Sequence, residues 1–301
     1  MMNLYKSLKP AKVENGFKMD GYYVWGASVI KGDDGLYYMF ASRWKKELPF
    51  PEGYMTGSEI VLATSKELEG PYEFKKVIIG KREGGYFDSV MAHNPHIKKI
   101  GDKYVLFYIG SPDGTQPARK IGYAVSDDLV NFQLSDNPID LPPNANNPSV
   151  VVLPTGKIML FFRDGELKVS VAAADKLGTD FRLLAYDLFD GKKIEDMFVF
   201  VRNSKYYMVA EDNRAHFTGH SRFGFLAESA DGINWEPSKN VIAYDHTIKL
   251  EDGSEINAVR RERPQFVFEN GKPVCMFTSF FDGENAYNVA QPLDLKENNN
   301  A

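Results

Sequence analysis

Several side chains in this sequence could exchange protons or supply a negative charge. Glu195, Asp196, Glu262 and His93 open short segments in which polar residues precede an apolar run, and Asp88 lies in an aromatic-rich stretch shortly before His93. A carboxylate and a proton donor that are held together can carry out general acid–base catalysis. We rank Glu195 or Asp196 first for a direct chemical role, followed by Asp88, Glu262 and His93.

A second set of residues near the same segments could bind a polar ligand. Two tryptophans could stack on a ring, three arginines could hold an anionic group, and one histidine lies in a polar loop after the fourth segment. The candidate binding residues are Trp25, Ser28, Arg43, Trp44, Asn94, His96, Asn147, Arg163, His220, Arg263 and Gln265. The alternative is that these side chains only cap strand ends or join neighbouring strands.

Local spacing constrains what these residues can do. Neighbours on a strand point to opposite faces, so only one of Glu195 and Asp196 is expected to face a ligand. His93 and His96 are three residues apart, so they should face opposite sides and not share an ion. Arginines flank Glu262 on both sides, which should lower the pKa of its carboxyl. We therefore expect no cofactor and no metal ligands, and leave open a calcium or other ion in a central channel.

The polar segments belong to a pattern that recurs five times. Each copy continues through an apolar run and a turn rich in Gly, Asn or Asp into a second strand rich in aromatic residues, which is typical of a β-hairpin. The openings are Trp25-Gly26-Ala27-Ser28, His93-Asn94-Pro95-His96, Asn146-Asn147-Pro148-Ser149, Glu195-Asp196-Met197-Phe198 and Glu262-Arg263-Pro264-Gln265.

A third strand and an outer fourth strand are predicted after most of these hairpins. Units of four strands that repeat five times predict an all-β, five-bladed β-propeller over residues 1–301. The blades should start near residues 25, 93, 146, 195 and 262. The first strand of every blade lines the channel of a propeller, so the five polar openings should converge at one channel mouth. A two-sheet sandwich would not explain why the same opening returns five times.

The repeat resembles that of the five-bladed propeller glycoside hydrolases, typified by glycoside hydrolase family 43 and its relatives in families 117 and 130. The resemblance covers nearly the whole chain. It rests on Trp25-Gly26-Ala27-Ser28, His93-Asn94-Pro95-His96-Ile97, Glu195-Asp196-Met197-Phe198-Val199 and Glu262-Arg263-Pro264-Gln265. It implies a glycoside hydrolase that acts on an oligosaccharide at the channel mouth.

The catalytic residues of family 43 are only partly matched. The resemblance implies an Asp base in the first blade, an Asp after the Pro of the second blade, and a Glu acid in a later blade. At these places the sequence has Trp25-Gly26-Ala27-Ser28, His96 and, as a loose counterpart, Glu195. Acid and base would then come from other carboxylates, with possible assistance from a histidine. A glycoside phosphorylase, a polysaccharide lyase and a non-catalytic glycan-binding propeller remain alternatives.

The composition narrows the classes of partner. A formal net charge of -5 without a basic cluster argues against nucleic acid, and no apolar run is long enough for a membrane helix. We expect a carbohydrate substrate and a cytoplasmic protein as written, or a periplasmic or secreted one if a signal preceded it. Cys275 is expected to be an inert core thiol. The loops 47–56, 111–119 and 244–259 are expected to shape the pocket.

Overall fold

Each sequence repeat folds into one small antiparallel sheet of the computed structural model, which describes residues 2–295. The first two sheets contain β1 (Tyr22–Lys31), β2 (Tyr37–Lys45), β3 (Glu59–Ser65) and β4 (Glu73–Ile79), then β5 (Met91–Ile100), β6 (Lys103–Ser111), β7 (Lys120–Ser126) and β8 (Phe132–Leu134). The third contains β9 (Asn146–Val152), β10 (Ile158–Arg163), β11 (Val169–Ala174) and β12 (Arg182–Ala185). The fourth and fifth contain β13 (Ile194–Arg202), β14 (Lys205–Asp212), β15 (Phe223–Ser229) and β16 (Glu236–Tyr244), then β19 (Arg260–Glu269), β20 (Lys272–Phe281) and β21 (Ala286–Pro292).

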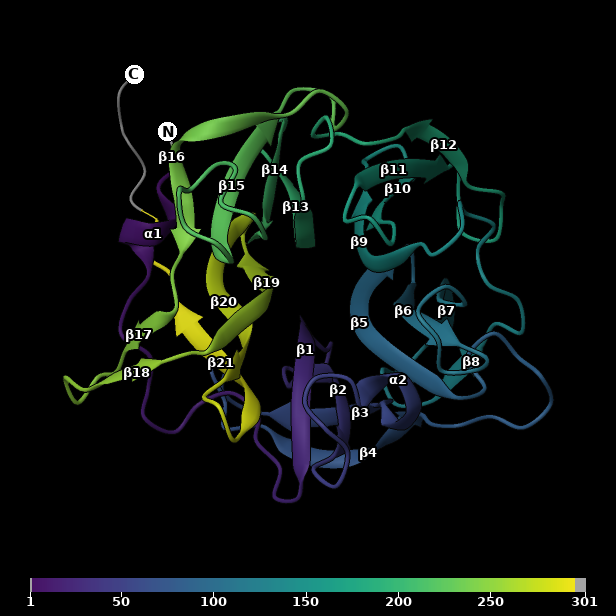
Figure 1. Ribbon diagram of the computed structural model, residues 1–301, viewed down its shortest axis with the longest axis horizontal. Helices are drawn as coiled ribbons and strands as arrows, with labels where there is room; N and C mark the ends of the chain where they lie inside the picture. Colours follow the sequence, from purple (N-terminus) through teal and green to yellow (C-terminus); the bar gives the residue numbers. More distant parts are fainter. Residues whose placement is uncertain (1, 296–301) are drawn as a thin grey trace.

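The five sheets are arranged as blades around one axis (Figure 1). Their first strands, β1, β5, β9, β13 and β19, stand at the centre and contact one another in cyclic order, with β19 returning to β1. The predicted all-β, five-bladed propeller is therefore confirmed. A sandwich would not close such a ring.

The core is divided among the interfaces between neighbouring blades. One apolar cluster lies at each interface, because both faces of every blade pack against a neighbour and bury β-branched and aromatic side chains. Burial of this apolar surface at roughly 25 cal/mol per Å² is the main force that holds the blades together. Cys275 belongs to the cluster between blades five and one and is fully buried, as expected.

All five inner strands carry the same β-bulge. The register slips by one residue between Trp25 and Ser28 of β1, and between His93 and His96 of β5. The three other inner strands slip at the equivalent place. The residue inside each bulge has a positive φ, between 52° and 60°: these residues are Gly26, Asn94, Asn147, Asp196 and Arg263. A bulge re-aims the side chains around it, so it decides what each blade presents at the channel mouth.

Blade five has three strands of its own, and the start of the chain covers its outer edge. The backbones of Phe17 and Asn288 exchange hydrogen bonds of 3.0 Å, and Lys9 donates to the carbonyl of Pro292. The segment before blade one thereby pairs with β21, the last strand of blade five. A short helix, α1 (Leu4–Ser7), precedes this segment. The pairing protects an otherwise open sheet edge and ties the two ends of the ring together.

This closure predicts a large difference between two glycine variants. A Cβ at Gly16, where φ is +63°, would lie 1.8 Å from the carbonyl oxygen of Asn288, whereas at Gly21, where φ is +76°, nothing lies within 4 Å. Gly21→Ala should cost about 1–2 kcal/mol for the left-handed backbone. Gly16→Ala should cost roughly 1–3 kcal/mol more, because β21 must move. Urea unfolding of both variants measures this, and equal losses would contradict the proposed closure.

Two smaller elements lie outside the blades. Helix α2 (Tyr54–Gly57) ends the loop between β2 and β3, and strands β17 (Thr247–Lys249) and β18 (Glu255–Asn257) form a separate hairpin. This hairpin projects away from the channel (Figure 1), and no residue of 244–259 lines the pocket described below, so the expectation for that loop was wrong. Within residues 2–295, no helix has the length and apolar character needed to cross a membrane.

Candidate active site

A pocket of about 350 Å³ lies at the channel mouth, where the five polar openings converge. Inner-strand residues form its floor, and the loops 47–56 and 111–119 contribute to its wall, as the sequence predicted. The lining residues are Trp25, Trp44, Phe50, Pro51, Glu52, Tyr54, Met55, His93, Asn94, Ile109, Gln116, Arg119, Asn147, Arg163, Gly165, Leu167, Glu195, Asp196, Arg260 and Glu262. The lining mixes aromatic rings with groups of both charges.

The bulge residues are linked by side-chain hydrogen bonds under the pocket. Asn94 Nδ2 donates to Asn147 Oδ1 at 2.8 Å, Asn147 Nδ2 donates to Asp196 Oδ1, and Arg263 Nη1 lies 3.3 Å from the same oxygen. At the fifth place, a Cβ on Gly26 would lie 2.9 Å from Asn94 Oδ1. The predicted convergence of these distant residues is thus observed, and glycine fits because its neighbours fill the space.

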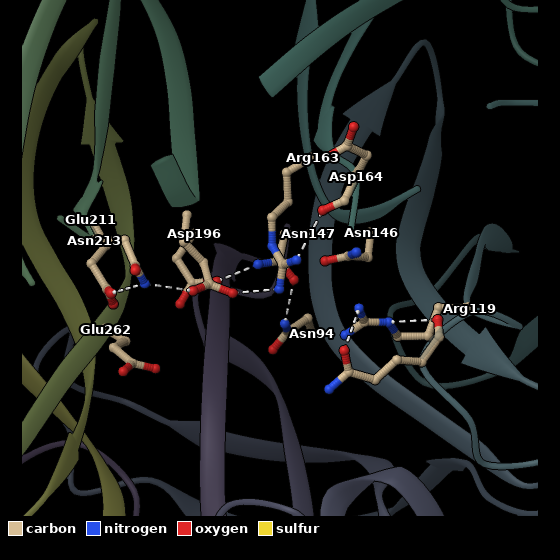
Figure 2. Close-up of polar contacts among 12 residues, drawn as sticks. Asn94, Arg119, Asn146, Asn147, Arg163, Asp164, Asp196, Glu211, Asn213 and Glu262 are labelled. Carbon is tan, nitrogen blue, oxygen red and sulfur yellow. Dashed lines mark hydrogen bonds and ion pairs between the residues drawn. The ribbon is translucent and has the colours of Figure 1, made fainter. Parts of the chain in front are cut away.

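Three buried carboxylates from blades four and five meet next to these hydrogen bonds. Single oxygen atoms of Asp196, Glu211 and Glu262 all lie within 4.8 Å of one another. Figure 2 shows them together on one side of Asn147. The pKa of Asp196 is raised, and the pKa of Glu211 is raised well above its usual value. Burial is the largest cause of both shifts, and the charges of neighbouring carboxylates act in the same direction. The site therefore favours the protonated form of both carboxyls more than water does.

Glu262 has the clearest shift of a carboxyl that lines the pocket. Burial raises the pKa of Glu262 to about 7, and the charges of Asp196 and Glu195 act in the same direction. The guanidinium of Arg260 opposes this effect without overcoming it. The sequence-based expectation of a lowered pKa was therefore wrong. Removal of water destabilises the ionised carboxylate more than the neighbouring arginines stabilise it.

Arginines already neutralise this acidic cluster. Arg222 Nη1 lies 3.0 Å from Glu211 Oε1 and 2.8 Å from Glu262 Oε1, and Arg260 Nε lies 2.8 Å from Glu262 Oε1. The spacing of the carboxylates would suit a metal ion, but the charge of the cluster does not require one. These arginines compensate the charge of the carboxylates within the fold itself.

Glu195 and Asp196 both reach the pocket, contrary to the expectation that they face opposite sides. The bulge in β13 interrupts the alternation of the strand between Glu195 and Phe198. Glu195 forms an ion pair with Arg163 and accepts a hydrogen bond from Asn213 Nδ2 at 3.2 Å. One bulge thus delivers two adjacent carboxylates to the same site.

His93 lines the pocket as a neutral ring. Burial lowers its pKa well below the usual value, and the charges of Arg263 and Arg119 act in the same direction. The hydroxyl of Ser58 donates to the carbonyl of Ala92, so His93 Nδ1 must carry the proton that it shares with Ser58 Oγ at 2.8 Å. Nε2 is then an acceptor, which contradicts the proposed role of His93 as a proton donor near neutral pH.

Two predicted residues lie outside the pocket in ion pairs. Asp88 is fully buried, pairs with Arg82 at 2.6 Å and accepts a hydrogen bond from the hydroxyl of Tyr108 at 2.8 Å. Arg43 pairs with Glu59 at 2.7 Å. Asp88 was wrong as a rim carboxylate and Arg43 as a pocket residue, because neither lies in the pocket lining.

Three further candidates lie in the buried channel below the pocket floor rather than in its lining. Ser28 Oγ donates to Gln265 Oε1 at 3.3 Å and accepts from the backbone nitrogen of Ile97 at 3.0 Å, and His96 Nε2 accepts from that of Val150 at 3.1 Å. These bonds join one blade to the next. Ser28, His96 and Gln265 therefore hold the ring together, which is the alternative that the sequence left open.

The remaining candidates differ in access. Trp25 and Trp44 line the pocket, but Trp44 is only 1% exposed and stacks on Phe50, so it supports the wall and offers little surface for a ring. Arg263 is buried beneath Asp196. His220 lies outside the lining and stacks on Phe223. Trp25, Asn94, Asn147 and Arg163 line the pocket, and their role in binding a ligand stays a prediction.

Sequence reasoning missed Glu211, Arg222 and Arg119. Glu211 is the cross-strand partner of Glu195, and Arg163 holds the equivalent place opposite Asn146. The pairing register of each hairpin therefore contained a signal for Glu211, because the second strand also places a side chain next to the bulge. Arg222 and Arg119 occupy the same place in their blades, immediately before the third strands β15 and β7, so the repeat contained a signal for them as well.

Comparison with known proteins places the fold. No family model matches the sequence. Probable arabinan endo-1,5-alpha-L-arabinosidase A of Aspergillus flavus and of Aspergillus oryzae is 30% identical over 113 residues, which are 36% of this chain and 30% of the relative. The match thus spans less than a third of the length of these curated relatives.

Solved structures match over almost the full chain. A BT0996 RGII complex has a TM-score of 0.73 at 13% identity, covering 95% of this protein and 92% of that one. A family 117 glycoside hydrolase from Zobellia galactanivorans has a TM-score of 0.71 at 15% identity, covering 98% and 92%. A GH43 β-xylosidase/α-arabinofuranosidase from a compost microbial metagenome, solved with xylotriose, has a TM-score of 0.68 at 13% identity, covering 96% and 98%. In fold, this protein resembles the five-bladed propeller glycoside hydrolases of families 43 and 117.

Proposed function

We propose that this protein is a glycoside hydrolase that cleaves an oligosaccharide in the pocket at the channel mouth. The observation that carries the proposal is the pairing of Glu262, whose pKa is raised to about 7, with the carboxylates of Glu195 and Asp196 in one lining. Glycoside cleavage needs a carboxylic acid that protonates the leaving oxygen and a carboxylate that acts as base or nucleophile. Both kinds of group are present here.

The environments suggest which residue takes which role. Glu262 is 7% exposed and holds a proton up to about pH 7, so it is the proposed acid. Glu195 is ion-paired with Arg163, and we assign to it the role of the carboxylate that attacks or activates water. The charge of Asp196 adds to the effect of burial on the pKa of Glu262. His93 lines the same pocket, and we propose that its Nε2 accepts a hydrogen bond from a sugar hydroxyl.

The similar proteins support a carbohydrate substrate. The partial curated relative is named as an arabinanase, and one matched structure was solved with xylotriose. The carboxylates Glu195, Asp196 and Glu262 of this pocket come from blades four and five, whereas the resemblance to family 43 implies carboxylates in blades one and two. We therefore propose that this protein catalyses the same class of reaction as these relatives, and we do not assign their particular sugars to it.

The test is a screen of oligosaccharides and aryl glycosides with analysis of the products. Hydrolysis should release a reducing sugar and consume one water per bond broken. A sugar phosphate formed only with added phosphate would indicate a phosphorylase, and an unsaturated sugar would indicate a lyase. Glycan binding without any product would contradict the proposal in favour of a binding propeller.

The pH dependence of kcat should follow the proton on Glu262. Because the pKa of this acid is raised to about 7, its protonated form is present below that pH and is lost as pH rises through it. We expect kcat to fall about tenfold for each pH unit above this limb. A pH profile from 5 to 9 measures this effect, and Glu262→Gln should remove the limb. An unchanged limb in the variant would assign the proton to another group.

A further inference from the structure

Arg119 is a buried cation in the pocket wall without a carboxylate partner. The residue is only 2% exposed, and its side chain lines the pocket. Arg163 and Arg260 also line the pocket, and each is ion-paired with a glutamate. For Arg119, no carboxylate of residues 2–295 comes within ion-pair distance. Burial lowers its pKa, which reflects the cost of keeping this charge from water.

Neutral oxygens hold the Arg119 guanidinium in place. Nε and Nη2 each lie 3.2 Å from Asn144 Oδ1, and Nη1 donates to the hydroxyl of Tyr54 at 3.1 Å. These bonds fix the plane of the group without forming an ion pair, and the charge of Glu195 acts on Arg119 only from beyond ion-pair distance. The second hydrogen of Nη1 and the hydroxyl hydrogen of Tyr54 find no acceptor in the described part of the chain. Two donors are therefore available for one anionic group of a ligand.

The position of Arg119 and its lack of an ion pair indicate what that group is. Figure 2 shows Arg119 on the far side of Asn94 and Asn147 from Glu262 and Asp196, so it lies apart from the carboxylate cluster. Four other arginines each pair with one of the four carboxylates at the acidic end. Arg119 has no such partner, and a planar guanidinium beside a hydroxyl suits a carboxylate group of a ligand.

We propose that Arg119 and Tyr54 bind the carboxylate of an acidic sugar, so that the substrate is a glycan that contains uronic acid. This inference rests on the proposed function for the cleavage step, and it adds the substrate class. The uronate would lie at the Arg119 end, and the bond to be broken would lie toward Glu262. The carboxylate would accept hydrogen bonds from Nη1 and from the Tyr54 hydroxyl.

The test is calorimetric titration with matched sugars, which needs no turnover. D-glucuronate is compared with D-glucose, and D-galacturonate with D-galactose. At least one acid should bind about 10- to 100-fold more tightly than its neutral partner, because hydrogen bonds to a charged group are stronger. Arg119→Gln should abolish this preference, and Tyr54→Phe should reduce it several-fold. Arg182→Gln, on the exposed edge strand β12, is the matched control and should leave it unchanged.

Several outcomes would overturn the inference. Equal binding of acids and neutral sugars by the unaltered protein would do so, as would a preference that survives Arg119→Gln. Tighter binding of inorganic phosphate, with phosphate-dependent cleavage, would assign the subsite to phosphate instead. Arg119→Lys keeps the charge and should retain part of the preference, which separates recognition from a fold defect. Uronate binding without any glycoside cleavage would contradict the proposed hydrolase and leave this subsite standing.

Discussion

Glu262→Gln is expected to lower kcat by about 10²- to 10⁴-fold on a glycoside with a poor leaving group, with little change in KM. The proposed acid is the pocket carboxyl whose pKa is raised to about 7, and glutamine cannot deliver its proton. Glutamine can still accept the bonds that Arg222 and Arg260 donate to Oε1, so the pocket should keep its shape. Steady-state kinetics at pH 6 measure the effect.

A change of leaving group makes this prediction specific. An aryl glycoside whose leaving phenol is acidic needs no proton, so Glu262→Gln should lose far less activity on it. Glu69→Gln is the matched control, because Glu69 also has a pKa raised by burial and lies outside the pocket lining. Equal losses on both kinds of substrate would exclude Glu262 as the acid. Glu195→Gln should lose activity on both, because its proposed role does not depend on the leaving group.

Arg263→Leu is expected to destabilise the protein by about 3–5 kcal/mol. Arg263 is 1% exposed, pairs with Asp196 at 3.3 Å and stands among the carboxylates of blades four and five. Its removal would leave buried negative charge without its nearest counter-charge, which is costlier than the loss of the pair itself. Guanidinium unfolding at pH 8 measures the change, and Arg182→Leu on the surface should lie within about 0.5 kcal/mol of the unaltered protein.

A double-mutant cycle separates the pair from the surrounding packing. Asp196→Leu with Arg263→Leu removes both charges, so the combined loss should be smaller than the sum of the single losses. A loss equal to the sum would show that the two residues act independently. It would also contradict the description of the bulge residues as one hydrogen-bonded series.

The fold was predictable because the same pattern of a polar opening, an apolar run and a turn occurs once in each of the five blades. The openings at Trp25, His93, Asn146, Glu195 and Glu262 all fall within the inner strands that the structure has. The fifth blade departs from the pattern, since its outer edge is covered by the segment around Phe17. That pairing joins the two ends of the protein and has no local signal, so no repeat could reveal it.

The site was only partly predictable, for reasons that concern backbone and solvent. Strict alternation would separate Glu195 from Asp196, but the bulge brings both to the pocket. The pKa of Glu262 depends on how completely the fold removes water, which flanking arginines in the sequence do not report. Asp88 looked available because Arg82 and Tyr108, its partners, follow no pattern that the sequence shows.

The β-bulge that all five inner strands share, with one residue at positive φ, has a consequence for how such a site can evolve. Because every inner strand bends in the same way, each offers an equivalent pair of positions, such as His93 and Asn94 or Glu195 and Asp196. A charged group that is useful in one blade can be gained in another while the scaffold stays the same. Point substitutions can therefore move the catalytic residues from one blade to another. Two relatives can then share every strand while their catalytic residues lie in different blades.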